Sequence, residues 1–499
     1  MSRPSDLPAE EVTASPPASA GGEGGTLLRG GSWLAAGQLL RNVLQIVVIV
    51  ILAKLLSPAD YGLATLAFIV IGFGYIFTEL GLTAAVVQKQ DLTEDDLRAA
   101  FWLNAGAGLV VTAVVATAAP SIAAVYDEPR LLPLLLVSSL TFTVSLGIVH
   151  TALLERAGRF RTLTVIDLAC TVFGWTVTVV AAASGLGALS LVLGPLLQAV
   201  LSSVVLWCTV RWLPRGRGSR MAYAHVWRFG RALSGYTVVN FLSFNADSIV
   251  VSRVAGTSEL GLYNRAYNLT RMPADQAFWI LDRLLLPTFS RLQTDRARLQ
   301  AAVLRSVGFS CLLLFPALFG MAVLAEPIVG GVLGDKWLGM VPLLQLLAIA
   351  SAPQVAVSVM RTVFTAAGAT GKLFRYGLVQ NAVTVAAILV GARWGPIGVA
   401  AALALRAWLG LPWLMAAPMR LLDLTWSAAV APMVRVLTAT LVMSGAVHLL
   451  DDGLADQPPA VRVSLGILLG VTVFGLSAAL VARTDIRSAI AFLRRRTSQ

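Results

Sequence analysis

The chain has 499 residues, of which 57% are hydrophobic and 13% are charged, and its formal net charge is +12. A water-soluble domain carries about 25% charged residues, so this chain has too little polar surface to face water on all sides. The composition excludes an ordinary soluble fold and indicates a protein of the lipid bilayer.

The first thirty residues are rich in Pro, Ser, Gly and Glu, and no apolar run precedes Leu27. A secretory signal peptide contains such a run, so this segment is not one. Its composition offers little apolar surface that folding could bury. We expect residues 1–30 to form a disordered tail on the cytoplasmic side.

Apolar segments follow one another along the rest of the chain. A helix needs about 20 mostly apolar residues to cross a bilayer. By that measure the sequence predicts an all-α integral membrane protein with about fourteen transmembrane helices. The predicted spans are 32–56, 61–87, 99–125, 131–154, 163–183, 189–210, 233–251, 260–286, 303–324, 338–359, 373–390, 397–415, 428–450 and 461–481.

Lysine and arginine are concentrated in alternate loops and in both tails. The other set of loops holds only Lys54, Arg130, Arg253, Lys336, Arg393 and Arg462. Cytoplasmic loops carry an excess of basic residues, so we expect both termini in the cytoplasm and a multi-pass protein of the cell inner (cytoplasmic) membrane. This pattern accounts for the positive net charge without any nucleic acid.

A weak internal repeat links the two halves of the chain. Segment 60–63 (Asp-Tyr-Gly-Leu) resembles segment 259–262 (Glu-Leu-Gly-Leu), and each lies between the first two helices of a group of six. The repeat predicts two pseudo-symmetric six-helix lobes, as in transporters that alternate between two open states. The predicted domains are a tail (1–30), an N-lobe (31–212), a basic cytoplasmic linker (213–232), a C-lobe (233–418), two further helices (419–482) and a basic cytoplasmic tail (483–499).

Polar side chains recur on one face of three predicted helices, because steps of three or four residues return to the same face. Charges in hydrocarbon cost about 2.5–3.5 kcal/mol each, so we expect these faces to line a water-filled cavity between the lobes. The three stripes are Gln38, Arg41 and Gln45; Asn240, Ser243 and Asp247; and Asn264, Asn268, Arg271, Asp275 and Asp282.

Arginine in such a cavity suits a phosphate group, because guanidinium donates two parallel hydrogen bonds to phosphate oxygens. Asp247, Asp275 and Glu79 are candidates for coupling transport to an ion. Two alternatives remain open: Arg271 pairs internally with Asp275, and Glu79 only contacts a neighbouring helix. The predicted substrate-binding residues are Arg41, Arg265, Arg271, Asn240, Asn268 and Gln38.

The sequence contains no catalytic or nucleotide-binding motif that we recognise. Segment 368–372 (Gly-Ala-Thr-Gly-Lys) has the wrong spacing for a P-loop. The three cysteines and three histidines are too dispersed to hold a metal ion. The predicted outside loops are too short for the catalytic domain of a glycan polymerase. We therefore expect neither a cofactor nor enzymatic activity.

Four segments resemble a known family, the bacterial oligosaccharide flippases. These proteins form the polysaccharide transporter branch of the multidrug/oligosaccharidyl-lipid/polysaccharide exporter superfamily. The segments are 52–62 (Leu-Ala-Lys-Leu-Leu-Ser-Pro-Ala-Asp-Tyr-Gly), 79–82 (Glu-Leu-Gly-Leu), 260–267 (Leu-Gly-Leu-Tyr-Asn-Arg-Ala-Tyr) and 289–293 (Phe-Ser-Arg-Leu-Gln).

The resemblance implies a V-shaped pair of six-helix lobes with two added helices. It also implies that the protein moves an undecaprenyl-diphosphate-linked oligosaccharide from the inner to the outer leaflet by alternating access. We expect a monomer, because one pair of lobes already forms a complete pathway. A polysaccharide polymerase is then a candidate partner. The alternatives within the superfamily are a cation-coupled exporter of drugs or metabolites and a lipid II flippase.

Overall fold

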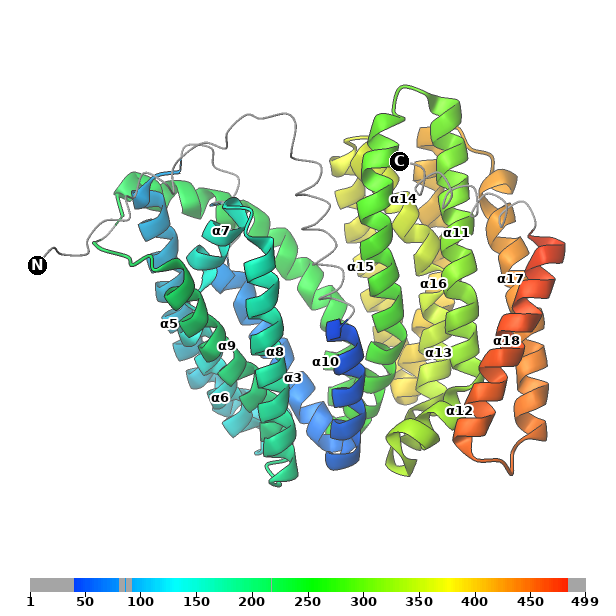
Figure 1. Ribbon diagram of the computed structural model, residues 1–499, viewed down its shortest axis with the longest axis horizontal. Coiled ribbons are helices and arrows are strands. Elements are labelled where there is room, and N and C mark those ends of the chain that lie inside the picture. Colours follow the sequence, from blue (N-terminus) through cyan, green and yellow to red (C-terminus); the bar gives the residue numbers. More distant parts are fainter. Residues whose placement is uncertain (1–39, 80–85, 87–91, 217, 483–499) are drawn as a thin grey trace, which may run out of the picture. The chain divides into compact units, whose positions relative to one another are not determined.

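The computed structural model describes residues 40–79, 86, 92–216 and 218–482, which form helices joined by short turns (Figure 1). Within these residues no β-strand occurs. The chain divides into two compact units, residues 1–242 (unit 1) and 243–499 (unit 2). The division falls inside the predicted seventh helix. The predicted terminal tails and Gln38 lie outside the described residues.

Unit 1 follows the predicted spans closely. A helix over residues 40–55 ends just before Ser57 and Pro58. The helices that follow are α3 (Pro58–Glu79), α5 (Glu94–Val125), α6 (Leu131–Val144), α7 (Ile148–Arg156), α8 (Phe160–Ala183) and α9 (Ala188–Val210). Helix α8 packs along α9, and α5 packs along α6.

The predicted fourth span is broken into α6 and α7, which meet at an angle of 46°. A break in a membrane helix frees backbone carbonyl groups that lipid cannot satisfy. Side chains of α9 supply the missing donors: Ser203 Oγ donates to Val144 O at 2.7 Å, and Trp207 Nε1 donates to Leu146 O at 3.1 Å. Neighbouring side chains therefore support the break, which apolar periodicity does not reveal.

Helix α10 (Arg220–Arg291) contains the predicted seventh and eighth spans as two arms that meet at Gly256. Gly256 has φ 81° and ψ −179°, a conformation open almost only to glycine. The break lies between the predicted spans 233–251 and 260–286, where the sequence places a turn.

Unit 2 contains the end of the first arm of α10, from residue 243 to the break, the second arm and the remaining helices. Its elements are α11 (Arg296–Val323), α12 (Ala325–Ile328), the π-helical η1 (Val329–Leu333), the 3-10 helix η2 (Asp335–Met340), α13 (Val341–Ser351), α14 (Gln354–Ala366), α15 (Thr370–Gly391), η3 (Ala392–Trp394), α16 (Gly395–Leu422), α17 (Trp426–Gly453) and α18 (Pro459–Val481).

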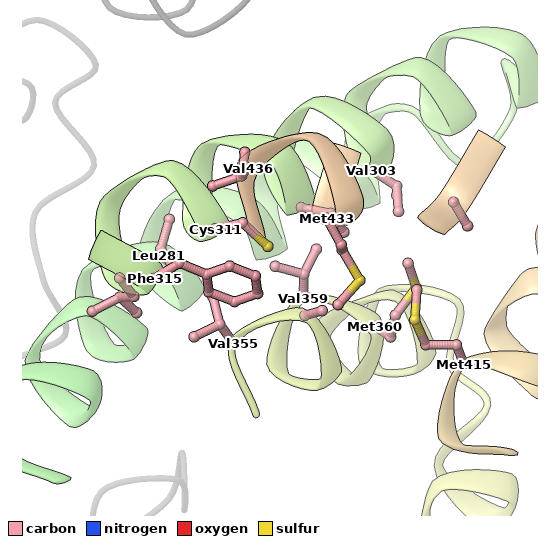
Figure 2. Close-up of a cluster of buried hydrophobic side chains, with 14 of the residues drawn as sticks. Leu281, Val303, Cys311, Phe315, Val355, Val359, Met360, Met415, Met433 and Val436 are labelled. Carbon is pink, nitrogen blue, oxygen red and sulfur yellow. The ribbon is translucent and has the colours of Figure 1, made fainter. Parts of the chain in front are cut away.

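The core of unit 2 joins the second six-helix group to the two C-terminal helices (Figure 2). Phe315 of α11, Val355 of α14 and Val436 of α17 are all completely buried in it. Lipid tails are as apolar as these side chains, so the hydrophobic effect does not drive these helices together within the bilayer. Close packing and polar contacts between the helices hold them instead.

A buried ion pair fastens the final hairpin. Arg462 of α18 donates from Nε and Nη2 to the two carboxylate oxygens of Asp451 in α17, both at 2.8 Å. The side chains are only 13% and 8% exposed. Glu326 of α12 lies 3.9 Å from the same guanidinium, so the pair also ties the hairpin to the rest of unit 2.

The two units repeat one helix ending in detail. Gly158 follows α7 with φ 66°, and Gly368 follows α14 with φ 65°. Both endings are Schellman motifs, which require a left-handed residue that is usually glycine. The defining bonds are Arg159 N to Leu154 O at 3.0 Å and Ala369 N to Phe364 O at 2.9 Å. The same type of ending, with a positive-φ residue and a bond to the carbonyl five residues back, also occurs after α5, α8 and α16. It is therefore a common helix ending in both units, and the two pseudo-symmetric lobes remain a prediction.

Nine helices of the described chain are long and apolar enough to cross a membrane, or ten when the bent pair α6–α7 is taken as one span. One of the nine ranges, Gly371–Leu422, contains two helices, most of α15 and all of α16. Helix α10 is not among the nine, because it is too polar by the same measure. The predicted all-α, multi-pass architecture is confirmed. The number of fourteen spans remains a prediction.

Candidate functional site

Asp247, from the polar stripe predicted in the seventh helix, lies where the two arms of α10 face each other. Tyr263 Oη donates to Asp247 Oδ2 at 2.9 Å, and the Ser248 amide donates to Asp247 Oδ1 at 2.7 Å. Asp247 is 4% exposed and Tyr263 is fully buried. The Asp247–Tyr263 bond therefore links the arms on either side of Gly256 and satisfies a buried carboxylate.

Arg271 is held by three neighbours. Its Nε donates to Asp275 Oδ2 at 3.0 Å, and its Nη1 donates to Tyr267 Oη at 2.9 Å. The guanidinium carbon lies 5.1 Å from the centre of the Phe244 ring and 5.6 Å from that of Tyr267, within the range of cation–π attraction. The predicted internal Arg271–Asp275 pair is thus present.

The guanidinium of Arg271 is fixed but still accessible. The side chain is 39% exposed and that of Asp275 is 54% exposed. Within the described residues Nη2 makes no hydrogen bond, so its two N–H groups remain available to an anionic ligand.

An aromatic stack joins these two sets of contacts. The rings of Tyr263 and Tyr267 lie 6.3 Å apart and are inclined by 16°. Asp247, Tyr263, Tyr267, Arg271 and Asp275 therefore form one connected group, which we call the α10 polar network. Sequence reasoning identified its charged members and missed the two tyrosines, because aromatic residues at helical spacing are typical of a core.

Arg265 occupies a different environment. It is 8% exposed, and its guanidinium carbon lies 5.9 Å from the centre of the buried Trp337 ring of η2. This position favours a packing contact inside unit 2 over direct contact with a ligand. Its predicted binding role is not part of the site described above.

The two predicted asparagines are more exposed than Arg265. Asn268 is exposed, and its Nδ2 donates to Oδ1 of Asn264 one turn earlier, at 2.6 Å. Asn240 is half-buried and lies in the part of α10 that belongs to unit 1. Asn268 therefore shares an accessible helix surface with Arg271, three residues further on.

The last acid of the eighth-helix stripe contacts α14. Thr362 Oγ1 donates to Asp282 Oδ1 at 2.6 Å, and Arg361 lies 3.7 Å from the other carboxylate oxygen. Asp282 therefore links two helices of unit 2 and lies outside the α10 polar network.

Unit 1 contains a separate ion pair between two helices. Arg41 Nη1 lies 2.6 Å from Asp167 Oδ2 of α8, with side chains 36% and 56% exposed. Arg41 thus has a carboxylate partner that helical spacing could not reveal. Glu79, the last residue of α3, is exposed. Within the part of the chain that the structure describes, no three His, Cys, Asp or Glu side chains are arranged to hold a metal ion.

Comparisons with known proteins place this geometry in context. The family model described as "Polysaccharide biosynthesis protein" matches residues 51–342. Lipopolysaccharide biosynthesis protein WzxC of Escherichia coli (strain K12) is 27% identical over 376 residues, which cover 74% of this chain and 76% of the relative. Succinoglycan biosynthesis transport protein ExoT of Rhizobium meliloti (strain 1021) is 28% identical over 368 residues, covering 74% of each chain.

Solved structures share the fold. The lipid II flippase MurJ in an inward closed conformation has a TM-score of 0.74, with 15% sequence identity and coverage of 91% of this chain and 99% of that chain. An inward-facing multidrug resistance MATE family transporter of the MOP superfamily has a TM-score of 0.57 and 15% identity, over 76% and 94% of the two chains. At these identities the likeness establishes the fold alone.

The family model covers more than half of the chain, including α3, the whole of α10 and the α10 polar network. The family resemblance seen in the four sequence segments is therefore confirmed. The multi-helix membrane fold agrees with it independently. The chain belongs to the polysaccharide biosynthesis protein family.

Proposed function

We propose that the protein is a flippase that moves undecaprenyl-diphosphate-linked oligosaccharide from the inner to the outer leaflet of the cytoplasmic membrane, for surface polysaccharide biosynthesis. The family match carries this proposal. Relatives named for lipopolysaccharide biosynthesis and succinoglycan transport support it. A third relative, teichuronic acid biosynthesis protein TuaB of Bacillus subtilis (strain 168), is 24% identical over 379 residues, covering 74% of this chain and 78% of the relative.

Arg271 is the residue best suited to the diphosphate of such a cargo. Nη2 and the second hydrogen of Nη1 can donate to phosphate oxygens, while Nε stays on Asp275. The bonds to Asp275 and Tyr267 fix the guanidinium before the ligand arrives, which lowers the entropy cost of binding. They also offset part of the cost of a charge in the membrane.

The exposed Asn268 supplies an amide near Arg271 that can bond sugar hydroxyl groups or phosphate oxygens. Its partner Asn264 holds the amide in place at 2.6 Å. Arg41 and Asn240 would act as secondary contacts from unit 1. Gln38 remains a candidate for substrate binding on sequence grounds alone. Arg265 is a weaker candidate, because it is buried.

Alternating access requires an element with two arrangements. In α10 the arms can pivot at Gly256, and the Asp247–Tyr263 bond holds the present arrangement. A change in the charge of Asp247, by protonation or by a bound cation, would weaken that bond. Asp247 is therefore our first candidate for ion coupling, with Asp275 and Glu79 as the others.

The finer aspects of the assignment follow from the loop charges and from the cargo. We place both termini in the cytoplasm because basic residues are concentrated in alternate loops and in the tails. A polysaccharide polymerase would consume the cargo on the opposite side. We expect a monomer, because the transporter fold contains a complete pair of lobes.

The alternative functions are less well supported. A cation-coupled exporter of drugs or metabolites agrees with the MATE-like fold, and a lipid II flippase agrees with the MurJ-like fold, but both likenesses are at 15% identity. The three relatives described above, at 24–28% identity, carry names from lipopolysaccharide, succinoglycan and teichuronic acid biosynthesis.

Deletion of the gene, followed by complementation, tests the proposal. We expect undecaprenyl-linked oligosaccharide to accumulate and surface polysaccharide to fall, with recovery by the wild-type gene but not by Arg271→Ala. Arg298→Ala is a matched control. Arg298 also pairs with an acid close to it in the sequence, Asp295 at the start of α11, but it is 78% exposed and lies outside the α10 polar network. Unchanged lipid-linked glycans together with altered drug sensitivity would favour the exporter.

A further inference from the structure

The chain that leaves α9 has a regular alternation of exposed and partly buried side chains. Arg211 ends α9 in a left-handed conformation, with φ 52°, and turns the chain out of the helix. In the residues that follow, Leu213 is 53% exposed and Arg215 is exposed, whereas Trp212 and Pro214 are half-buried. Residues 211–215 therefore present two arginines and one leucine on the outer side; we call this segment the arginine strap.

Hydrogen bonds from unit 1 fix the strap in place. A ring nitrogen of the fully buried His150, Nε2, lies 3.1 Å from Trp212 O. Trp102 Nε1 donates to Gly216 O, also at 3.1 Å. The strap is thus attached at its second residue and directly after its last one.

Ring packing supports the same attachment. His150 stacks on Trp207 at 5.1 Å and meets the edge of Trp212 at 5.7 Å. Phe101 contacts both tryptophans, at 5.8 and 6.1 Å. An attachment of this kind leaves the strap backbone little freedom, so a ligand bound by its side chains would not have to order the chain.

Close packing continues just past the strap. A Cβ atom added to Gly218 would lie 2.7 Å from Asp95 O and 2.9 Å from Ala99 N, so the backbone lies directly against the start of α5. Only a residue without a side chain fits there without moving the backbone of α5.

The outward arginines carry uncompensated charge. Within the described residues neither Arg211 nor Arg215 forms a side-chain hydrogen bond or an ion pair. The nearby acids Glu94 and Asp95 are already paired with Arg98, each at 3.3 Å. These two described acids are therefore engaged with Arg98 and not with the strap.

The strap lies at the ends of two candidate membrane spans, where lipid headgroups are expected. It follows directly on α9, a candidate membrane span that ends at Val210. It is also attached to the first turns of α5, another candidate span, which begins at Glu94. Trp102, 44% exposed beside the strap, is a residue typical of membrane interfaces. Two cations beside an exposed leucine at this level match a surface of phosphate groups above acyl chains.

We propose that the arginine strap is a docking surface for anionic phospholipid, in which Arg211 and Arg215 bind headgroup phosphates and Leu213 enters the acyl region. Guanidinium groups suit this ligand because they donate paired hydrogen bonds to phosphate oxygens. The inference does not depend on the flippase assignment, since it concerns the rim of unit 1 and not the α10 polar network.

Binding of phosphatidylglycerol to the purified full-length protein in neutral detergent tests the strap. Native mass spectrometry or the lipid-dependent rise of the unfolding temperature gives the half-saturating lipid concentration. We expect Arg211→Gln with Arg215→Gln to raise that concentration at least about fivefold. The double Lys variant keeps the charge but not the paired donors, so it should retain only part of the affinity. Arg130→Gln with Arg393→Gln removes the same charge elsewhere and should have no such effect.

Three results would overturn the proposal. The first is equal affinity of the double Gln variant and the wild type for phosphatidylglycerol. The second is equal binding of phosphatidylcholine and phosphatidylglycerol by the wild type. The third is displacement of the lipid by millimolar inorganic diphosphate, which would indicate a site for soluble anions. Leu213→Asn should weaken lipid binding without creating sensitivity to diphosphate.

Discussion

In each unit an arginine from a helix predicted to line the transport path pairs with an aspartate, but the two pairs differ. In unit 1, Arg41 reaches another helix to meet Asp167 at 2.6 Å. In unit 2, Arg271 pairs with Asp275 one turn away and is also held by Tyr267. The first pair links two helices, whereas the second fixes a guanidinium on a single helix and leaves part of it open to a ligand.

The comparison separates stability from ligand binding. An exposed pair between helices contributes at most about 1 kcal/mol, because water and salt screen it. A fixed guanidinium with N–H groups to spare can instead contribute its binding energy to an anionic cargo. We therefore expect replacements in unit 2 to affect transport strongly and those in unit 1 to act weakly.

Arg271→Ala should have the largest effect. Loss of two charge-assisted hydrogen bonds to the diphosphate should slow transport about a hundredfold, measured as the rate of appearance of surface polysaccharide per copy of protein. Arg271→Lys keeps the charge but not the planar donor pair, so it should recover only part of the rate. Normal transport by Arg271→Ala would remove Arg271 from the site.

Gly256→Ala should have the largest effect on stability, about 2 kcal/mol, because a side chain is strained at φ 81° and ψ −179°. Thermal unfolding of the purified protein measures the loss. Gly445→Ala in α17 is the control: a Cβ there meets nothing within 4 Å, and the backbone is helical, so stability should be unchanged or slightly higher. Equal behaviour of the two variants would contradict a strained break in α10.

Tyr263→Phe should cost about 1.5 kcal/mol, because the buried Asp247 loses a hydrogen-bond donor while the ring stays in place. Tyr267→Phe is the matched variant in the same stack, and it removes instead the hydroxyl that holds Arg271. We expect Tyr263→Phe to lower the unfolding temperature more, and Tyr267→Phe to raise the lipid-linked substrate concentration needed for transport. The reverse pattern would contradict the assignment of Tyr263 to stability and of Tyr267 to substrate binding.

Arg41→Ala should have the smallest effect on stability, below about 1 kcal/mol, as expected of a half-exposed ion pair. Asp167→Ala should give the same small change, and the double variant should be no worse than either single variant if the pair is their only shared contribution. A loss of transport as large as that of Arg271→Ala would show instead that Arg41 also binds the cargo.

Apolar periodicity predicted the helices well, because the membrane demands long apolar segments. The predicted starts and ends agree with α9 and α18 to within a few residues. It could not predict the break between α6 and α7, since the donors that satisfy it, Ser203 and Trp207, come from another helix.

Helical spacing in the sequence also identified the charged residues of the site, but not the side chains that contact them. Helical steps show which side chains share a face, but they do not show what lies opposite. Spacing predicted a binding role for Arg265 and could not show its contact with Trp337, which makes Arg265 a weaker candidate. Tyr263 resembled a core residue until its bond to Asp247 was known. The left-handed Gly256 could have been suspected from the turn between two predicted spans.

The most direct test of the flippase assignment is transport by the purified protein in proteoliposomes. Undecaprenyl-diphosphate-linked oligosaccharide placed in one leaflet is followed by its accessibility to an added membrane-impermeant glycosidase. We predict that wild type and Arg298→Ala move the lipid across the bilayer and that Arg271→Ala is about a hundredfold slower. Movement no faster than in protein-free liposomes, under a proton or sodium gradient as well as without one, would contradict the account.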